Sequence, residues 1–299
     1  MDVLNLAGQE SHRAVALETT LLVHGVPGEV APGLASDLQA DVRSAGAVPA
    51  VVGVVGGRAV FGLGSDEIAE LIGDACVPKL NTANLGVALH RGWNGATTVS
   101  TTMEIAAAVG CRVFATGGIG GVHRGYAERL DISADLAALA RFPVAVVASG
   151  VKGILDVAST REALESLGVP VIGFQTDVFP AFYVRESGEP VDARFDDAAD
   201  LARYIAAELR RSGRGILVCQ PAPKEAAMDA EEFGRAFEEA SRQAPAGGRD
   251  ATPRLLARLH EVTGGRTLEV NLALARANAR LAGAIAAALP PDESEPSSR

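Results

Sequence analysis

Short apolar runs alternate with segments of helical character along most of the chain, and this alternation constrains the possible folds more than any other feature of the sequence. The runs predicted as buried strands are 14–23, 48–55, 113–115, 144–148, 170–176 and 215–219. Apolar residues at helical spacing, or helix-capping signals, occupy segments between and after them, including 32–45, 65–73, 159–168, 196–211, 229–242, 252–260 and 267–289. Strands separated by helices favour an α/β fold.

Composition limits the classes of protein to consider. The 299 residues, 48% of them hydrophobic, suffice for one large α/β domain or two smaller ones. The sequence shows neither a leader peptide nor a run of about 18 apolar residues, so we expect a cytoplasmic protein without a membrane partner. A net charge of -10 with one Trp and three Tyr argues against nucleic-acid binding and favours a small-molecule partner. Cys76, Cys111 and Cys219 are far apart, so we expect three reduced core residues and no disulfide framework or zinc site.

The segment 112–135 contains the clearest candidate for a ligand site. A buried strand at 113–115 runs directly into residues 116–121, TGGIGG, whose glycines allow a ligand to approach the main chain. Asp131, Ser133 and Asp135 then occupy alternate positions where a helix is expected to begin. Two carboxylates and a hydroxyl beside a glycine-rich loop predict an oxygen-rich site for a hard cation or a sugar.

Lysine is rare in this chain, which draws attention to each one. Only three of the 27 basic residues are Lys, at positions 79, 152 and 224, and unlike Arg a Lys can lose its proton. Lys152 lies in a glycine-rich apolar turn after strand 144–148, and in one interpretation its amine is a nucleophile. In the alternative interpretation its stem covers the core and its ammonium group reaches water. Lys224 beside Glu225 is predicted to be an exposed cation.

Three further polar positions each allow two interpretations. Glu18 interrupts the first strand, where a carboxylate is either a strand-end group in solvent or an active-site group. The hydroxyls of 97–102 either cap the following helix or form a phosphate cradle with Lys79 nearby. Asn271 interrupts the apolar face of helix 267–289 and either bonds to neighbouring backbone or points into a site. P-loop, Rossmann, zinc-hydrolase and Ser/His/Asp hydrolase motifs do not occur.

Six blocks together resemble the pseudouridine-5'-phosphate glycosidase family, also called indigoidine synthase A-like. They are ALETTLLVHGVP (16–27), NGATTVSTTM (94–103), VFATGGIGGVHRG (113–125), DISADL (131–136), GVKGILD (150–156) and TPRLLARL (252–259). The resemblance implies a three-layer α/β/α sandwich around a mixed, largely parallel sheet, as one catalytic domain over 1–289, usually in a homotrimer. The polar, proline-rich residues 290–299 are expected to form a disordered tail.

The resemblance also implies an activity: making or breaking the C–C bond between uracil and ribose 5-phosphate, with Mn²⁺ or another divalent cation such as Mg²⁺. On matching positions, Glu18 resembles the general acid/base, Lys152 the amine that forms an imine with the sugar C1', and Asp131 the metal ligand. Lys79, Val99, Ser133, Ala134 and Asp135 resemble the substrate-binding positions. We also expect Thr98, His123 and Asn271 to bind substrate. An imine supplies the electron sink that a C-glycoside needs, because simple protonation of a leaving heteroatom is not available to it.

Two departures from the family pattern bear on the acceptor ring. Lys79 is followed by LNTANL where the family has an Arg-Asp pair, and residues 220–223 read QPAP in place of Asn-Pro-x-Pro. The first favours a retained ribose 5-phosphate with a changed partner ring. Three functions therefore stay open: pseudouridine 5'-phosphate cleavage, a C-glycosynthase that joins ribose 5-phosphate to a non-uracil heterocyclic or aromatic acceptor, and a sugar-phosphate-binding protein without catalysis. The joint presence of Glu18 and Lys152 argues against the third.

Overall fold

The computed structural model of the chain describes residues 1–243 and 251–291. Within them the strands form one 11-stranded sheet, in the order β1-β4-β3-β2-β7-β8-β11-β9-β10, with β6 on β3 and β5 on β6. The strands are β1 (Val3–Asn5), β2 (Ala14–Glu18), β3 (Val48–Val55), β4 (Arg58–Phe61), β5 (Lys79–Leu80), β6 (Gly95–Thr97), β7 (Val113–Ala115), β8 (Ala145–Ala148), β9 (Val171–Phe174), β10 (Ala193–Phe195) and β11 (Ile216–Cys219). Strand pairs are parallel except β3 with β4 and β3 with β6.

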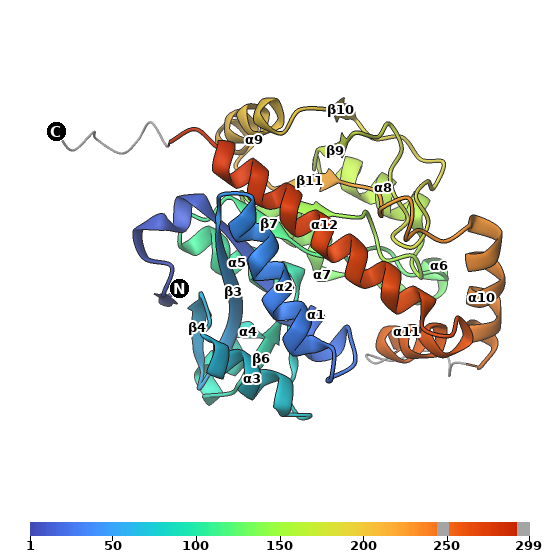
Figure 1. Cartoon of the computed structure of the whole chain (residues 1–299), viewed down its shortest axis with the longest axis horizontal. Helices are drawn as coiled ribbons and strands as arrows, with labels where there is room; N and C mark the ends of the chain where they lie inside the picture. The colour runs from blue at the N-terminus through green and yellow to red at the C-terminus, as the bar shows by residue number, and fades with distance from the viewer. Residues whose placement is uncertain (244–250, 292–299) are drawn as a thin grey trace.

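Helices cover both faces of this sheet (Figure 1). On one face α12 (Arg266–Ala288) packs against β2, β7 and β8 and is flanked by α2 (Ala31–Ser44) and α9 (Ala198–Ser212). On the other face α5 (Val99–Ala108) packs beside α7 (Ala134–Arg141). The remaining helices are η1 (Gly8–Arg13, a 3₁₀ helix), α1 (Thr20–His24), α3 (Ser65–Gly73), α4 (Leu85–Arg91), α6 (Tyr126–Arg129), α8 (Val157–Ser166), α10 (Ala230–Gln243) and α11 (Ala251–Val262). The expected three-layer sandwich is confirmed.

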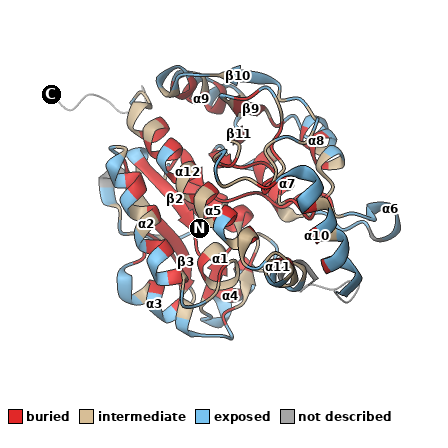
Figure 2. Cartoon of the chain, turned by 45° about the vertical axis from the view of Figure 1, so that its right-hand side comes forward, coloured by how far each residue is buried: buried red, intermediate tan, exposed pale blue. Residues whose placement is uncertain are grey.

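The central strands are buried because both of their faces are covered. Every residue of β2, β7, β8 and β11 is buried, as Figure 2 shows for the middle of the molecule. Parallel strands enclosed in this way are apolar at every position, without polar alternation. The strands β2, β7, β8 and β11 accordingly consist of apolar residues apart from Glu18, which ends β2.

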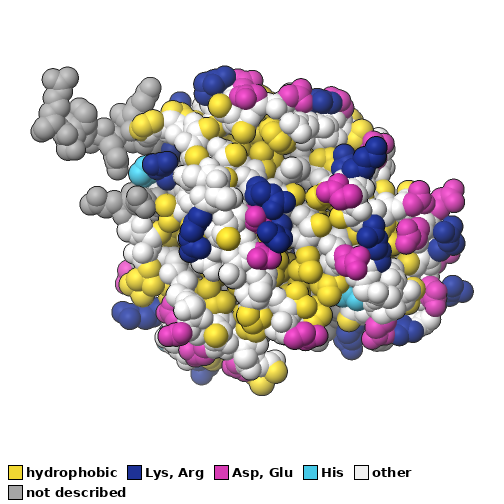
Figure 3. Space-filling view, in the orientation of Figure 1, with side chains coloured by type: hydrophobic (Ala, Val, Ile, Leu, Met, Phe, Trp, Pro, Cys, Tyr) yellow, Lys and Arg dark blue, Asp and Glu magenta, His cyan; other side chains and the backbone are white. Residues whose placement is uncertain are grey.

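A charged cluster fastens α12 to α2. Asp41 is 7% exposed and accepts hydrogen bonds from Arg276 Nε (2.8 Å) and Arg280 Nη1 (2.9 Å), while Asp37 pairs with Arg276 Nη1 at 2.9 Å. Figure 3 shows basic and acidic side chains meeting on this face of the molecule. The helices also approach closely at Gly283, where an added Cβ would lie 2.7 Å from the Cβ of Ala45. The long C-terminal helix is thus fixed in position along the sheet.

Several expectations need correction. The strand predicted over 14–23 ends at Glu18, because the chain turns at Thr19, whose hydroxyl donates to Val52 O (3.0 Å) and accepts from Thr97 N (2.8 Å). Cys111 and Cys219 are buried, but Cys76 is exposed rather than part of the core. In the described part of the chain no helix is long and apolar enough to span a membrane. The tail expected at 290–299 falls mainly on residues outside the described ones.

Candidate active site

The carboxyl ends of three adjacent parallel strands form the candidate active site. Strands β2, β7 and β8 are neighbours in the sheet, so residues just after them meet at one edge, which is where ligands bind in open α/β sheets. Glu18 is the last residue of β2, Thr116 follows β7, and Lys152 lies four residues beyond β8. The sheet therefore brings together side chains that are 36 or more positions apart in sequence.

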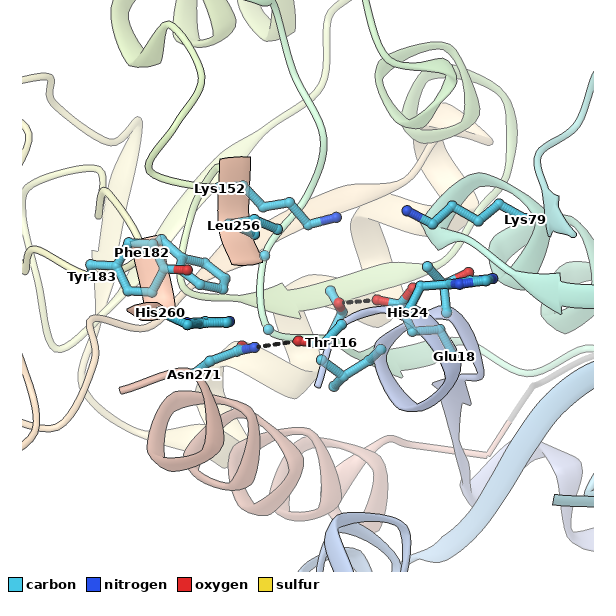
Figure 4. Close-up of a pocket in the computed structure, with 15 residues that line it drawn as sticks. Glu18, His24, Lys79, Thr116, Lys152, Phe182, Tyr183, Leu256, His260 and Asn271 are labelled. Atoms are coloured by element: carbon cyan, nitrogen blue, oxygen red, sulfur yellow. Dashed lines mark hydrogen bonds between the residues drawn. The ribbon is translucent and has the colours of Figure 1, made fainter. Parts of the chain in front are cut away.

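Glu18 is a buried carboxylate, only 6% exposed. Loss of solvent raises its pKa, against the opposing effects of the Lys152 charge and of the Thr116 hydroxyl, which donates a hydrogen bond to Glu18 Oε1. Figure 4 shows this hydrogen bond beside the pocket. A carboxyl group whose pKa moves toward neutrality gives up and takes back a proton more readily near physiological pH.

Two lysines from different elements face this carboxylate. Lys152, after β8, and Lys79, in β5, extend toward one another across the pocket (Figure 4). Both interact electrostatically with Glu18. The main chain of Lys152 is held by a bond from its N–H to Ile119 O (3.0 Å). Two lysine side chains at one opening suit an anionic ligand.

The pocket has two lobes that share Glu18, Thr20, Lys79 and Lys152. The outer lobe, of about 230 Å³, is polar and is also lined by Asn81, Thr98, Val99, Gly120, His123, Ile132, Ser133, Ala134, Asp135 and Leu155. The inner lobe, of about 60 Å³, is also lined by Leu21, His24, Gly25, Thr116, Gly117, Gly118, Phe182, Tyr183, Leu256, His260 and Asn271. Glu18 and Lys152 thus lie where the two lobes meet.

The outer lobe contains the beginnings of α5 and α7. The Asp135 carboxylate joins them, because Oδ1 accepts from Ser100 N (2.9 Å) and Oδ2 from Gly120 N (2.8 Å). Ser133 caps α7 by accepting from Asp135 N at 3.2 Å. Gly120 must be a glycine, since an added Cβ would lie 2.3 Å from Ser133 Oγ. Backbone N–H groups at helix N-termini beside lysines suit a phosphate.

Some hydroxyls of residues 97–102 support the fold, and others line the pocket. Thr97 and Thr101 donate to the main-chain oxygens of Val52 and Leu80, both at 2.7 Å, and therefore support the fold. Thr98 lines the outer lobe, where its hydroxyl lies 3.0 Å from that of Ser100. Only part of this cluster is thus available to a ligand.

The expected metal ligand, Asp131, lies at the rim rather than inside the pocket. Its side chain is 61% exposed, and its Oδ2 is 3.9 Å from Nδ1 of His123, which lines the outer lobe. Within the described residues no group of three or more His, Cys, Asp or Glu could enclose a metal ion. One available carboxylate at an open rim fits Mg²⁺ or Mn²⁺ held mostly by water and substrate oxygens.

The inner lobe is walled by aromatic and aliphatic side chains. The rings of Phe182 and Tyr183 pack edge to face, 4.8 Å apart, and Phe182 has a left-handed backbone (φ 64°). Burial lowers the pKa of His24 and of His260, which favours their neutral forms. Apolar walls with neutral imidazoles suit an uncharged planar ring.

Asn271 both bonds to neighbouring backbone and points into the site. Its Nδ2 donates to Gly25 O at 3.4 Å, and its side chain also lines the inner lobe. Among the described residues, Asn271 Oδ1 is one of the few buried side-chain atoms that lack a hydrogen-bond partner. An unpaired buried oxygen beside a cavity is an acceptor for a ligand donor.

Several lining residues were not predicted as site residues from the sequence: Thr20, His24, Thr116, Phe182, Tyr183, Leu256 and His260. The position of Thr116 could have been predicted, because it directly follows a strand predicted to be buried. Glu18 likewise lies at the end of a buried strand. The others come from α1, from α11 and from an irregular segment after β9, and their local sequences carry no sign of this position.

Comparison with known proteins agrees with the architecture. The profile described as indigoidine synthase A like protein matches residues 4–288. Pseudouridine-5'-phosphate glycosidases of Nocardioides sp. and Methylobacterium nodulans are 45% and 49% identical, covering 91% and 92% of this chain and 90% and 83% of their own lengths.

Two crystal structures have the same fold. The prealnumycin C-glycosynthase AlnA in complex with ribulose 5-phosphate is 37% identical, with a TM-score of 0.88 over 97% of this chain and 98% of its own. An indigoidine synthase A-like protein of Thermotoga maritima is 35% identical, with a TM-score of 0.87 over 95% of this chain and 96% of its own. The resemblance in the sequence is thereby confirmed, and the chain belongs to the indigoidine synthase A-like family.

Proposed function

We propose that the protein reversibly cleaves and forms the C–C bond between ribose 5-phosphate and uracil, as an enzyme of the pseudouridine-5'-phosphate glycosidase type. The observation that carries this proposal is the position of Glu18 and Lys152 between a polar lobe and an aromatic lobe. The names of the similar curated proteins support the same activity.

Each lobe has a part in binding. The sugar phosphate occupies the outer lobe, where Thr98, Val99 and Ser133 to Asp135 surround the helix starts and Lys79 supplies positive charge. The base occupies the inner lobe, with its face on Phe182 and its polar edge toward Asn271 and His24. This arrangement directs the sugar C1' to the junction of the lobes.

At the junction, Lys152 and Glu18 divide the chemistry. In the synthetic direction the Lys152 amine adds to the C1' aldehyde of the open sugar and water leaves, which gives an imine. The ring carbon of the base attacks C1', the C=N electron pair moves onto nitrogen, and Glu18 takes the proton that the ring carbon releases. A sugar hydroxyl then bonds to C1', the C1'–N bond to Lys152 breaks, and the hydroxyl proton passes to the departing amine. Cleavage is the reverse sequence.

We also propose a divalent cation, a homotrimer and a cytoplasmic location. Asp131, with His123 beside it, would hold Mn²⁺ or Mg²⁺. Such an ion supplies positive charge that neutralises phosphate or sugar oxygens. The trimer and the location rest on the family resemblance and on sequence composition.

A C-glycosynthase with a non-uracil acceptor is the second candidate. It is favoured by the structural similarity to the prealnumycin C-glycosynthase, by the LNTANL sequence after Lys79, and by the apolar side chains Leu21 and Leu256 in the inner lobe. Incubation with ribose 5-phosphate, Mn²⁺ and either uracil or aromatic acceptors separates the two, because each predicts a different coupled product. A binding protein without catalysis predicts no product with any acceptor.

Borohydride trapping tests the mechanism. The protein is mixed with ribose 5-phosphate, reduced, digested and analysed by mass spectrometry, and we expect a reduced sugar adduct on the peptide that contains Lys152. Lys152→Met should abolish the adduct and turnover, whereas Lys79→Met should keep the adduct at saturating sugar phosphate and Lys224→Met should change neither. An adduct absent from Lys152 in an active enzyme would remove the imine mechanism but leave the reaction itself standing.

A further inference from the structure

One fully buried side chain in α12 joins the loop that leads to Lys152 to the loop whose Thr116 bonds to Glu18. Asn278 is 0% exposed. Its Nδ2 donates to Thr116 O at 2.9 Å and to Ser149 Oγ at 3.2 Å, and it lies 3.4 Å from Gly117 O. A single carboxamide therefore contacts the chain directly after β7 and directly after β8.

Each of these loops leads to a reacting group. On the β7 side, Thr116 donates its hydroxyl hydrogen to Glu18. On the β8 side, Ser149 begins the turn that reaches Lys152, and Ser149 N donates to Gly117 O at 2.9 Å. The loops are also bonded to one another further out, where Lys152 N donates to Ile119 O. A shift of the Asn278 amide would thus move both groups.

Asparagine is well suited to this position. Its amide nitrogen supplies two N–H donors, and the acceptors here are main-chain oxygens at the ends of buried strands and one hydroxyl. An apolar residue would remove the donor to Thr116 O, and a buried oxygen left without a partner is costly. Asn271 and Asn278 are seven residues apart, two helical turns, and so lie on the same face of α12. On that face Asn271 lines the inner lobe, and Asn278 bonds to the loops after β7 and β8.

We propose that Asn278 is a positioning residue that fixes Glu18 and Lys152 relative to one another. This inference rests on the proposed function, since it assigns Asn278 a part in that reaction. It acts on Glu18 through Thr116 and on Lys152 through Ser149, and does not itself touch the substrate. A purely structural role would affect folding stability alone, whereas a positioning role also affects kcat and the pH dependence of the reaction.

The test is the steady-state kinetics of Asn278→Ala with pseudouridine 5'-phosphate and Mn²⁺, across pH and well below the melting temperature. We expect kcat to fall about 10- to 100-fold, with KM changed by less than about twofold because the phosphate lobe is untouched. The limb of the pH profile that reports Glu18 should move to higher pH, since a loosened Thr116 hydroxyl no longer lowers the pKa of Glu18. In a Thr116→Val background that movement should disappear.

Two further variants separate a positioning role of Asn278 from a purely structural one. Arg280→Ala lies on the same helix and loses a bond to Asp41, so it should lower the melting temperature but keep kcat and the pH profile. Asn278→Ser retains a hydroxyl donor and should give a smaller fall in kcat, even if Asn278→Ala does not fold. Unchanged kcat and pH profile in both Asn278 variants of an active enzyme would overturn this inference alone. A wild-type protein that neither turns over nor forms an adduct would overturn the proposed function as well.

Discussion

Thr116 and Glu18 come from adjacent parallel strands, and the Thr116 hydroxyl donates a hydrogen bond to the Glu18 carboxylate at the edge of the sheet. The same carboxylate is removed from solvent, which raises its pKa, while Lys152 and Thr116 oppose that rise. The protein thus keeps a carboxyl group where its ionised form is disfavoured. Such a group costs stability and is suited to proton transfer.

Replacement of Glu18 by Gln should reduce activity and increase stability. We expect kcat to fall by about 10²- to 10⁴-fold, the usual contribution of a general acid/base. Burial raises the folded-state pKa of Glu18 above its unfolded value. Below the unfolded pKa of about 4, Glu18 is protonated in both states and does not affect stability. As pH rises through the folded-state pKa, ionisation of Glu18 destabilises the folded protein. Thermal unfolding at pH 8 should therefore give Glu18→Gln a higher Tm, by about 2 °C for each kcal/mol gained.

Glu208→Gln is the control, because it should change the Tm in the opposite direction. Hydrogen bonds from Arg211 lower the pKa of Glu208, so its ionised form stabilises the folded state above the unfolded pKa and this gain is lost at low pH. Its Tm should be lower than wild type at pH 8, and the difference should shrink as pH falls through the lowered pKa of Glu208. A lower Tm for Glu18→Gln at pH 8 would mean that its attraction to Lys152 outweighs its desolvation.

Gly150→Ala should disrupt the Lys152 turn. Gly150 has a φ of 75°, and an added Cβ would lie 1.9 Å from Pro180 O, a main-chain atom that cannot rotate away. We expect a loss of about 3 kcal/mol or more in the free energy of unfolding, measured by urea denaturation. Gly213→Ala is the matched comparison, with φ 65° and nothing within 4 Å of the new Cβ, and should cost only about 1 kcal/mol. Equal losses would show that strain alone, without the clash, matters at Gly150.

Asp41→Ala should loosen α12 from α2. It removes the acceptor for Arg276 and Arg280, and we expect a cost of about 1–3 kcal/mol in urea denaturation. This is less than the about 3–5 kcal/mol of a fully buried pair, because the two Arg side chains are 39% and 49% exposed. Arg235→Ala, which breaks an exposed pair with Glu231 at 3.8 Å, should change stability by less than about 0.5 kcal/mol. A similar small effect of Asp41→Ala would contradict the role of the cluster.

Asp131→Asn should weaken the response to metal. Loss of its charge should raise the Mn²⁺ concentration for half-maximal activity about tenfold, in a titration of metal-depleted enzyme. Asp66→Asn, in the first turn of α3, should leave that concentration unchanged. An unaltered Mn²⁺ response in Asp131→Asn would place the cation elsewhere.

The alternation of apolar runs and helices predicts an α/β fold and the strands β2, β3, β7, β8, β9 and β11, because parallel strands enclosed on both faces are mostly apolar. It does not predict β1, β4, β5, β6 or β10. The joint role of Glu18 and Lys152 was expected from the family resemblance. The inner lobe could not be predicted in this way. Phe182 and Leu256 reach it from segments whose packing depends on the completed fold, and a residue-by-residue pattern records no such contact. Asp131 was assigned by resemblance, and its place at an open rim has no signature in local sequence.

Helix α12 is translated after every strand of the sheet, yet it supplies Asn271 to the inner lobe and Asn278 to the two strand-end loops. During synthesis the sheet therefore emerges from the ribosome while these loops still lack their anchor. A nascent chain interrupted before residue 266 carries Glu18, Lys79 and Lys152 but lacks the Asn278 amide that bonds to both loops. The proposed role of Asn278 therefore implies that activity begins only once α12 has docked on the sheet.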